Sequence, residues 1–263
     1  MTEKLLDRVG ALLAKAESTD SIHEAEALVA KAQELATIHA VDLAMARQRT
    51  QRRHRREQPE QRKQVIGKRG QTGLRHRVGL FVAIGHVNDL CIDVARDATY
   101  VLSFGFPSDL DLVETLYGSL ATQMTAAATA AIKRGDHKEH PYWSDAAAAW
   151  RTDARVYRSA FSEGFIETIG GRLRSVRAAT IAAPRREDRA EHPTGAELVL
   201  VAKAAEVASF HRATSDARGT WSSSGRSGSP WSEGAHRASS DAGRTAQLAA
   251  RREIQGARGD LSA

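Results

Sequence analysis

Apolar residues near the N-terminus recur every three or four positions, which is the spacing of an amphipathic helix. This pattern predicts a helix over residues 3–16 and a second one from Ile22 to about His39. Ser21 and Glu24 form a capping box, in which both side chains bond free backbone N–H groups at a helix start. The short connection indicates that the two helices form an antiparallel hairpin.

The pattern changes after this hairpin. Val41 and Asp42 interrupt it, and a third helix beginning at Leu43 is predicted to run into a series of arginines and to end at Pro59. Residues 57–73 contain Pro, three Gly and several Gln without an apolar period. We interpret these residues as a mobile linker between two structured regions.

A larger region follows from Leu74 onward. A helix with Val78, Phe81 and Ile84 on one face precedes two strands, predicted at residues 90–95 and 99–104 with a turn between them. The remaining patterns predict helices at residues 109–133 (capped by Ser108), 145–179, 197–213 and 235–254, with loops at 135–144 and 219–234. Trp150 is the first of a series of aromatic residues in the helix predicted at 145–179.

These elements predict an α+β fold that is predominantly α-helical. An N-terminal helical hairpin is joined to a larger domain, in which a short antiparallel β-hairpin packs on long helices. The predicted boundaries are 1–57 for the hairpin domain with its Arg-rich third helix, 58–73 for the basic linker, 74–255 for the α+β domain and 256–263 for the tail.

Positive charge is concentrated in one part of the chain, residues 47–77, which we call the basic segment. It holds twelve Lys and Arg against two Glu, a net charge of +10, whereas the whole chain carries +6 and the remainder therefore carries −4. Arg49, Arg52, Arg53 and Arg56 share one face if the segment begins as a helix. Charge of this density indicates a polyanionic partner, although charge runs are commonly just solvated.

We expect the basic segment to contact nucleic-acid phosphates without sequence preference, with RNA or the ribosome as suitable as DNA. The predicted contact residues are Arg47, Arg49, Arg52, Arg53, Arg55, Arg56, Arg62, Lys63, Lys68 and Arg69. Aromatic residues make up 5% of the chain and fall mostly on predicted core faces, so few remain for base stacking of the kind that single-strand binders use. A second group, Arg151, Arg155 and Arg158, is interpreted as the ordinary polar face of a core helix.

No catalytic, metal or cofactor motif is recognisable. His137 and His140 are three residues apart in a predicted loop with no third ligand, and the order differs from HExxH. The stretch from Gly219 to Ser227 has five residues between its glycines and Arg where a phosphate-binding loop needs Lys. Cys91 lacks a neighbouring base in the sequence and is interpreted as a small core residue. A non-catalytic protein is therefore favoured over a hydrolase with an unrecognised site around Asp136, His137 and His140.

The single cysteine excludes an intramolecular disulfide and a cysteine-based zinc site, which favours a cytoplasmic protein. The N-terminus mixes charges with its apolar residues, unlike a signal peptide, and no segment reaches the length of apolar sequence that spans a membrane. A protein-interaction module, in which the Ala-rich hairpin docks a partner helix and the arginines meet an acidic surface, is the alternative to nucleic-acid binding.

The N-terminal motifs resemble a known family. The runs LLAKAEST at Leu12, EAEAL at Glu24 and KAQEL at Lys31 are similar to the helical hairpin of the family called domain of unknown function 2786. The run YRSAFSEGF at Tyr157 and SFGF at Ser103 are similar to the second domain that usually accompanies it. The resemblance implies a two-part organisation and a bacterial or phage origin, and supplies no activity, catalytic residues or cofactor.

Overall fold

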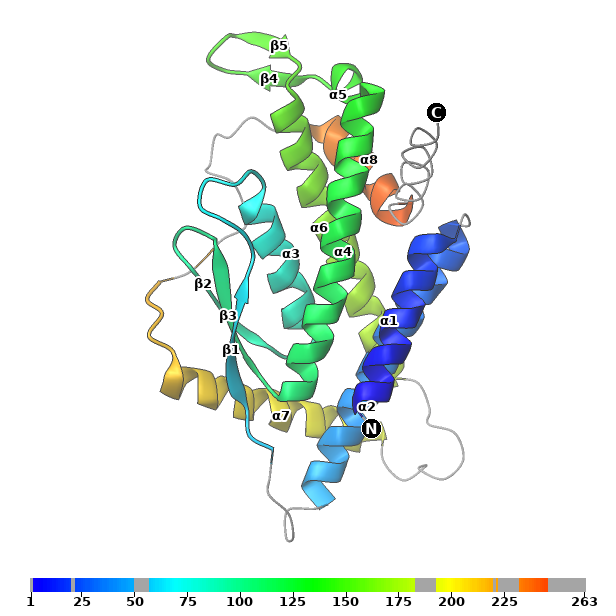
Figure 1. Ribbon diagram of the computed structural model, residues 1–263, viewed down its shortest axis with the longest axis vertical. Coiled ribbons are helices and arrows are strands. Elements are labelled where there is room, and N and C mark those ends of the chain that lie inside the picture. Colours follow the sequence, from blue (N-terminus) through cyan, green and yellow to red (C-terminus); the bar gives the residue numbers. More distant parts are fainter. Residues whose placement is uncertain are drawn as a thin grey trace, which may run out of the picture.

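The computed structural model describes residues 2–19, 22–49, 57–182, 193–219, 221 and 232–245, and all structural statements concern these residues. Within them the chain is mostly helical, as the sequence predicts, and it contains two small antiparallel sheets, of which the sequence predicted only the β-hairpin of residues 90–104. Most of the long helices run side by side along the molecule, one lies across their lower end, and the larger sheet lies on one side of them (Figure 1). No described helix has the length and apolar character needed to cross a bilayer.

The N-terminal hairpin consists of α1 (Thr2–Ser18) and α2 (Ile22–Arg49). The prediction of a third helix after Val41 is wrong, because α2 continues without a break to Arg49. The buried positions of α2 keep a spacing of three or four residues beyond Val41, and they are Val29, Ala32, Gln33, Ala36, Thr37, Ala40, Val41 and Ala44. Val41 is one of these buried positions, so the residue interpreted as an interruption of the pattern belongs to the apolar face of the helix.

A three-stranded antiparallel sheet follows, with strand order β1-β3-β2. Its strands are β1 (Glu60–Val65), β2 (Cys91–Val94) and β3 (Tyr100–Gly105), and α3 (Leu74–Val87) lies between β1 and β2 in the chain. The predicted hairpin of β2 and β3 is confirmed. The interpretation of residues 57–73 as a mobile linker is wrong over β1, which pairs with β3 along its whole length.

Two long helices, α4 (Pro107–Arg134) and α6 (Ala154–Ala182), form the centre of the molecule. Phe106, and not the predicted Ser108, is the N-cap residue of α4, and Pro107 occupies the first turn, where its missing N–H has no helical partner to lose. Asp153 caps α6 by accepting a bond of 2.6 Å from the backbone N–H of Arg155.

The segment between these helices differs from its prediction. Residues 135–153 contain the short helix α5 (Asp136–Glu139) and a two-stranded hairpin of β4 (Tyr142–Ser144) and β5 (Ala149–Arg151). The predicted helix over residues 145–179 therefore begins nine residues late, at Ala154. Trp150 and Arg151 lie in β5, and the hairpin extends beyond the helices at the end where α6 begins (Figure 1).

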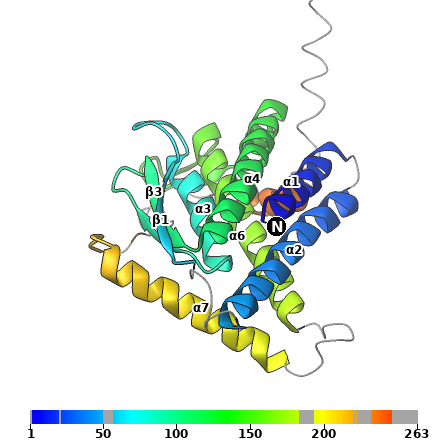
Figure 2. The ribbon, with the colours of Figure 1, turned by 60° about the horizontal axis from the view of Figure 1, so that its bottom comes forward.

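The last two helices cover the outer surfaces. α7 (Pro193–Thr214) crosses one face of the larger sheet and contacts Phe104 through Val207 and Phe210 (Figure 2). α8 (Glu233–Thr245) packs on α6 at Gly164, where an added Cβ would lie 1.9 Å from Ser239 Oγ and 2.8 Å from a backbone oxygen. Glycine is required at this crossing because the two backbones approach so closely.

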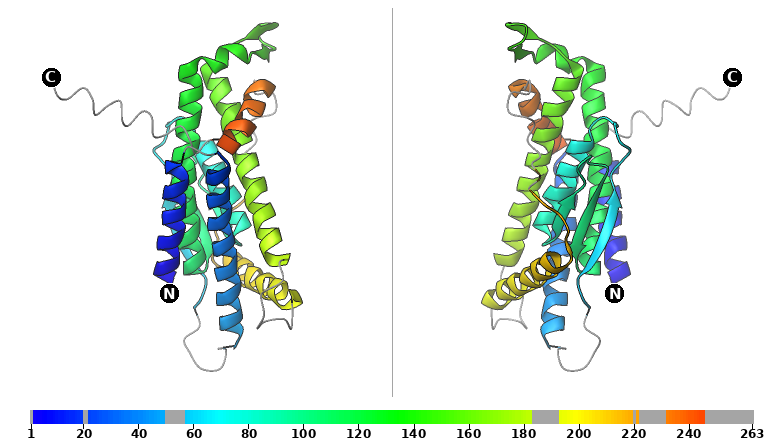
Figure 3. Two further views of the ribbon diagram at one scale, coloured as in Figure 1. Left: turned by 90° about the vertical axis from the view of Figure 1, so that its right-hand side faces the viewer. Right: turned by 90° about the vertical axis from the view of Figure 1, so that its left-hand side faces the viewer.

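The buried apolar side chains of the hairpin and of the larger region form one continuous cluster. Val9, Leu13 and Val29 belong to the same cluster as Leu116 of α4 and Phe165 of α6. Two side views show α1 beside α4 and α2 beside α6 (Figure 3). The hairpin therefore buries its apolar face against the rest of the chain, and the predicted domain boundary at residue 57 stays a prediction.

Candidate functional site

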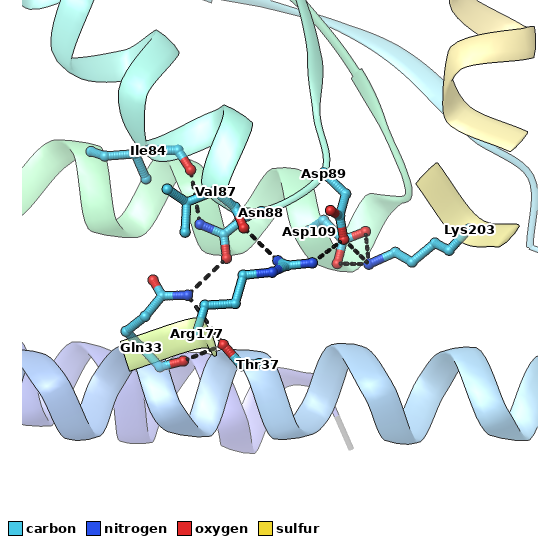
Figure 4. A network of polar contacts seen from close by, with 9 residues as sticks. All are labelled: Gln33, Thr37, Ile84, Val87, Asn88, Asp89, Asp109, Arg177 and Lys203. Carbon is cyan, nitrogen blue, oxygen red and sulfur yellow. Dashed lines mark hydrogen bonds and ion pairs between the residues drawn. The ribbon is translucent and has the colours of Figure 1, made fainter. Parts of the chain in front are cut away.

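A buried polar network links the hairpin to the larger region (Figure 4). Lys203 of α7 donates a bond of 2.8 Å to Asp109 of α4 and lies 4.0 Å from Asp89, which follows α3. Arg177 of α6 donates to the same Asp89 carboxylate at 2.6 Å and to the carbonyl oxygen of Val87. The charges of this network are balanced by one another, so we assign it a role in holding the helices together.

The hairpin joins this network through uncharged groups (Figure 4). The amide of Gln33, fully buried on α2, donates a bond of 3.2 Å to Asn88, whose own amide donates to the carbonyl oxygen of Ile84 at 2.9 Å. Gln33 is also 3.3 Å from the hydroxyl of Thr37. These directional bonds fix the position of α2 against the end of α3, because a shift along the helix would leave buried polar groups unpaired.

The predicted contact residues are spread along the basic segment. Arg47 and Arg49 lie in the last turn of α2, and Arg52, Arg53, Arg55 and Arg56 fall outside the described residues. Lys68 and Arg69 are exposed in the turn between β1 and α3. Lys63 is exposed on β1, so its ammonium group is available at the surface. Its Nζ is 4.1 Å from the centroid of the Tyr100 ring, which is a cation–π contact.

Arg62 has a different environment from its neighbours, because it lies on the inward face of β1. Its guanidinium is 2.6 Å from Asp111 and 3.4 Å from Glu114, both on α4, and 2.7 Å from Glu60. Partial burial opposes the charged form, but the hydrogen bonds to Asp111 and Glu60 raise the pKa of Arg62 above its usual value. Its charge is balanced within the fold, so Arg62 anchors β1 to α4.

A cavity of about 380 Å³ opens where the N-terminal turns of α3 and α6 meet the C-terminal half of α4. We call it the arginine pocket, and its lining residues are Thr72, Gly73, His76, Arg77, Met124, Thr125, Ala128, Arg155, Arg158, Ser159 and Ser162. Its size is within the range of small-molecule sites. The sequence placed Arg155 and Arg158 on an ordinary polar helix face, whereas the fold brings them together with Arg77.

The electrostatics of the arginine pocket favour an anion. None of its lining residues is a carboxylate, and among the described residues no ion pair binds Arg77, Arg155 or Arg158. Met124 and Ala128 supply an apolar wall. Guanidinium groups beside an apolar surface suit a phosphate ester, because the planar N–H groups can each donate two bonds to its oxygens.

A serine and a histidine meet inside the pocket. Ser159 Oγ is 3.1 Å from His76 Nε2, and Glu163 Oε1 is 3.5 Å from each of these atoms. In a catalytic triad the carboxylate bonds the other ring nitrogen, so that it orients the base and stabilises the imidazolium. Here Ser159 and Glu163 share one nitrogen, which is the geometry of a polar cluster that positions the His76 ring.

Residues that the sequence raised as catalytic alternatives lie elsewhere. His137 is on α5, and His140 stacks on Tyr157 with ring centroids 6.0 Å apart. Among the described residues no three His, Cys, Asp or Glu side chains are placed to hold a metal ion together. Burial, together with the Asp93 carboxylate, raises the pKa of the half-buried Cys91 thiol, which disfavours the reactive thiolate. Of the stretch from Gly219 to Ser227, only Gly219 and Trp221 are among the described residues.

Residues 4–43 match the family model described as Protein of unknown function (DUF2786). The match covers α1 and most of α2, and the resemblance expected for the N-terminal hairpin is confirmed. No curated protein and no solved structure matches the chain. The similarity of residues 74–180 to the usual second domain stays a prediction.

Proposed function

We propose that this protein binds nucleic acid by contacting phosphates through the basic segment, without sequence preference. The observation that carries the proposal is the separation of charge, +10 in residues 47–77 against −4 in the rest of the chain. Neutralised phosphates release counterions, and this release supplies most of the free energy of non-specific binding. The charge of a general basic surface would instead be distributed along the whole sequence.

The fold supports this proposal at the C-terminal end of the basic segment. Lys63, Lys68 and Arg69 are exposed along β1 and the following turn, and Arg77 lines the arginine pocket. Arg155 and Arg158 extend the same positive surface onto α6. Arg62 is left out of the proposed surface, because its charge is balanced by Asp111, Glu114 and Glu60.

The test replaces Arg47, Arg49, Arg52, Arg53, Arg55 and Arg56 by Gln. We expect this variant to lose about tenfold or more in affinity for both duplex DNA and RNA at low salt. The negative slope of log K against log salt should decrease in magnitude by about 0.9 for each duplex phosphate contact that is lost. Fluorescence anisotropy between about 50 and 200 mM salt measures both quantities.

A matched control separates local from overall charge. Six exposed basic residues elsewhere are changed to Gln, namely Lys4, Arg8, Lys138, Arg174, Arg212 and Arg218. This variant has the same net charge as the first and should retain the affinity of the unmodified protein. Equal affinity of the first variant and the unmodified protein for DNA and RNA would contradict the proposal. A salt-insensitive protein complex that survives nuclease would then favour the protein-interaction alternative.

A further inference from the structure

Two tryptophans are exposed on the β4–β5 hairpin. Trp143 and Trp150 are directly opposite in the ladder, with ring centroids 5.7 Å apart at an interplanar angle of 76°. They are 47% and 68% exposed, whereas Phe104, Phe161 and Phe165 are fully buried. The edge-to-face contact helps to hold a small hairpin together, since two strands alone are marginally stable. That role does not account for Trp150, most of whose surface remains in contact with solvent.

The hairpin leads directly into the arginine pocket. Trp150 is followed by the exposed Arg151, and α6 begins three residues later with Arg155 in its first turn. Trp150 and Arg155 are five positions apart in the chain, so their Cα atoms are at most roughly 17 Å apart. An exposed aromatic ring and a group of guanidinium side chains therefore lie within reach of one short ligand.

We propose that Trp150 and the arginine pocket bind single-stranded nucleic acid. An unpaired base stacks on Trp150, and the neighbouring phosphates contact Arg155, Arg158 and Arg77. This inference rests on the proposed function, to which it adds the form of the ligand. A base in a duplex has both faces covered by its neighbours, so a stacking side chain selects unpaired nucleotides. This corrects the expectation from composition, because one of the few aromatic residues is available for stacking.

The test uses an oligothymidylate of about 20 nucleotides, longer than the ~4–16 nucleotides that single-strand-binding folds cover. Trp150→Ala should weaken its binding by about 5- to 150-fold, the range for removing one stacked base. Trp150→Phe should restore part of the affinity, because a phenyl ring still stacks. Affinity for a duplex of equal length should change less than twofold in both variants.

A second readout and two further variants guard against loss of the hairpin itself. The oligothymidylate should quench the tryptophan emission of the unmodified protein, and Trp150→Phe should lose part of this quenching while still binding. The pocket variant Arg155→Gln with Arg158→Gln, which leaves β4 and β5 unchanged, should also weaken single-strand binding. Leu198→Ala, at a side chain that is 66% exposed on α7, is the control and should bind as the unmodified protein does.

The outcomes separate this inference from the proposed function. If Trp150→Ala retains its affinity for oligothymidylate while the six-arginine variant loses binding, the proposed function stands and the Trp150 site is wrong. If the unmodified protein binds neither duplex nor single strand, both are wrong. Thymidine monophosphate is also added as a competitor of the oligothymidylate. If it displaces the oligomer equally well from the unmodified protein and from Trp150→Ala, the arginine pocket binds a free nucleotide and the inference is overturned.

Discussion

Replacement of Lys203 by Met is expected to lower the free energy of unfolding by about 3–5 kcal/mol, because it removes one partner of a buried ion pair. Lys203 and Asp109 have side chains that are 4% and 7% exposed, and their charged atoms are 2.8 Å apart. The Asp109 carboxylate would keep the favourable field of the α4 N-terminus, but it would lose its cation in a site that water barely reaches. Urea denaturation of both proteins measures the difference.

Two further variants identify the cause. Lys138→Met removes the same kind of side chain from an exposed position on α5 and should change stability by less than about 0.5 kcal/mol. Lys203→Met combined with Asp109→Asn removes both charges of the pair, and it should recover part of the lost stability since the buried negative charge that Lys203 balanced is removed as well. If the free energy of unfolding of Lys203→Met lies within about 1 kcal/mol of that of the unmodified protein, the buried pair contributes as little to stability as an exposed ion pair does.

The N-terminal hairpin, prepared alone as residues 1–49, is expected to lose cooperative folding entirely. Val9, Leu13 and Val29 are each at most 4% exposed, and they belong to a cluster completed by α4 and α6. Without those helices the same side chains face water, and Gln33 loses the bond to Asn88. Most helical stability in proteins comes from such packing and little comes from propensity.

Far-UV circular dichroism tests this expectation. The peptide should show partial helix content that decreases gradually on heating, since α2 is rich in Ala. The full chain should melt in a sigmoidal transition under the same conditions. A sigmoidal transition of the peptide, with helix content close to that of α1 and α2 in the full chain, would show that the hairpin is an independent folding unit.

The helices were predictable wherever one face is apolar and the other is polar. α1 follows this rule, and its predicted bounds, 3–16, lie within two residues of those observed. β1 could not be found in this way, because its half-buried positions are Glu60, Arg62 and Gln64. The inward face of this strand is stabilised by ion pairs with α4, and such long-range pairs leave no periodic apolar signal in the sequence.

The β4–β5 hairpin was missed for the opposite reason. Trp150 and the alanines before it fit the helical spacing that continues correctly from Tyr157, so the local pattern favoured one long helix. The turn uses Ala148 with a φ of 47°, a conformation that is uncommon for residues other than glycine and that no turn motif marked.

The arginine pocket was invisible for a third reason. Arg77 and Arg158 are far apart in the chain, and only the packing of α3 on α6 brings them together. The helical register of Arg155 and Arg158 was visible in the sequence, but their partner helix was not. The basic segment, in contrast, was evident from charge alone because it is contiguous.

The position of β1 sets a minimum length for any polyanion that uses the whole basic segment. Its six residues span about 20 Å. The end of α2 lies near the lower end of the molecule in Figure 1, whereas β1 leads up to the turn that enters the arginine pocket. A stacked strand rising ~3.4 Å per nucleotide needs about six nucleotides to run alongside β1. A shorter fragment can contact only one end of the basic segment at a time. The number of nucleotides that one bound protein covers on a long strand therefore depends on the length of β1.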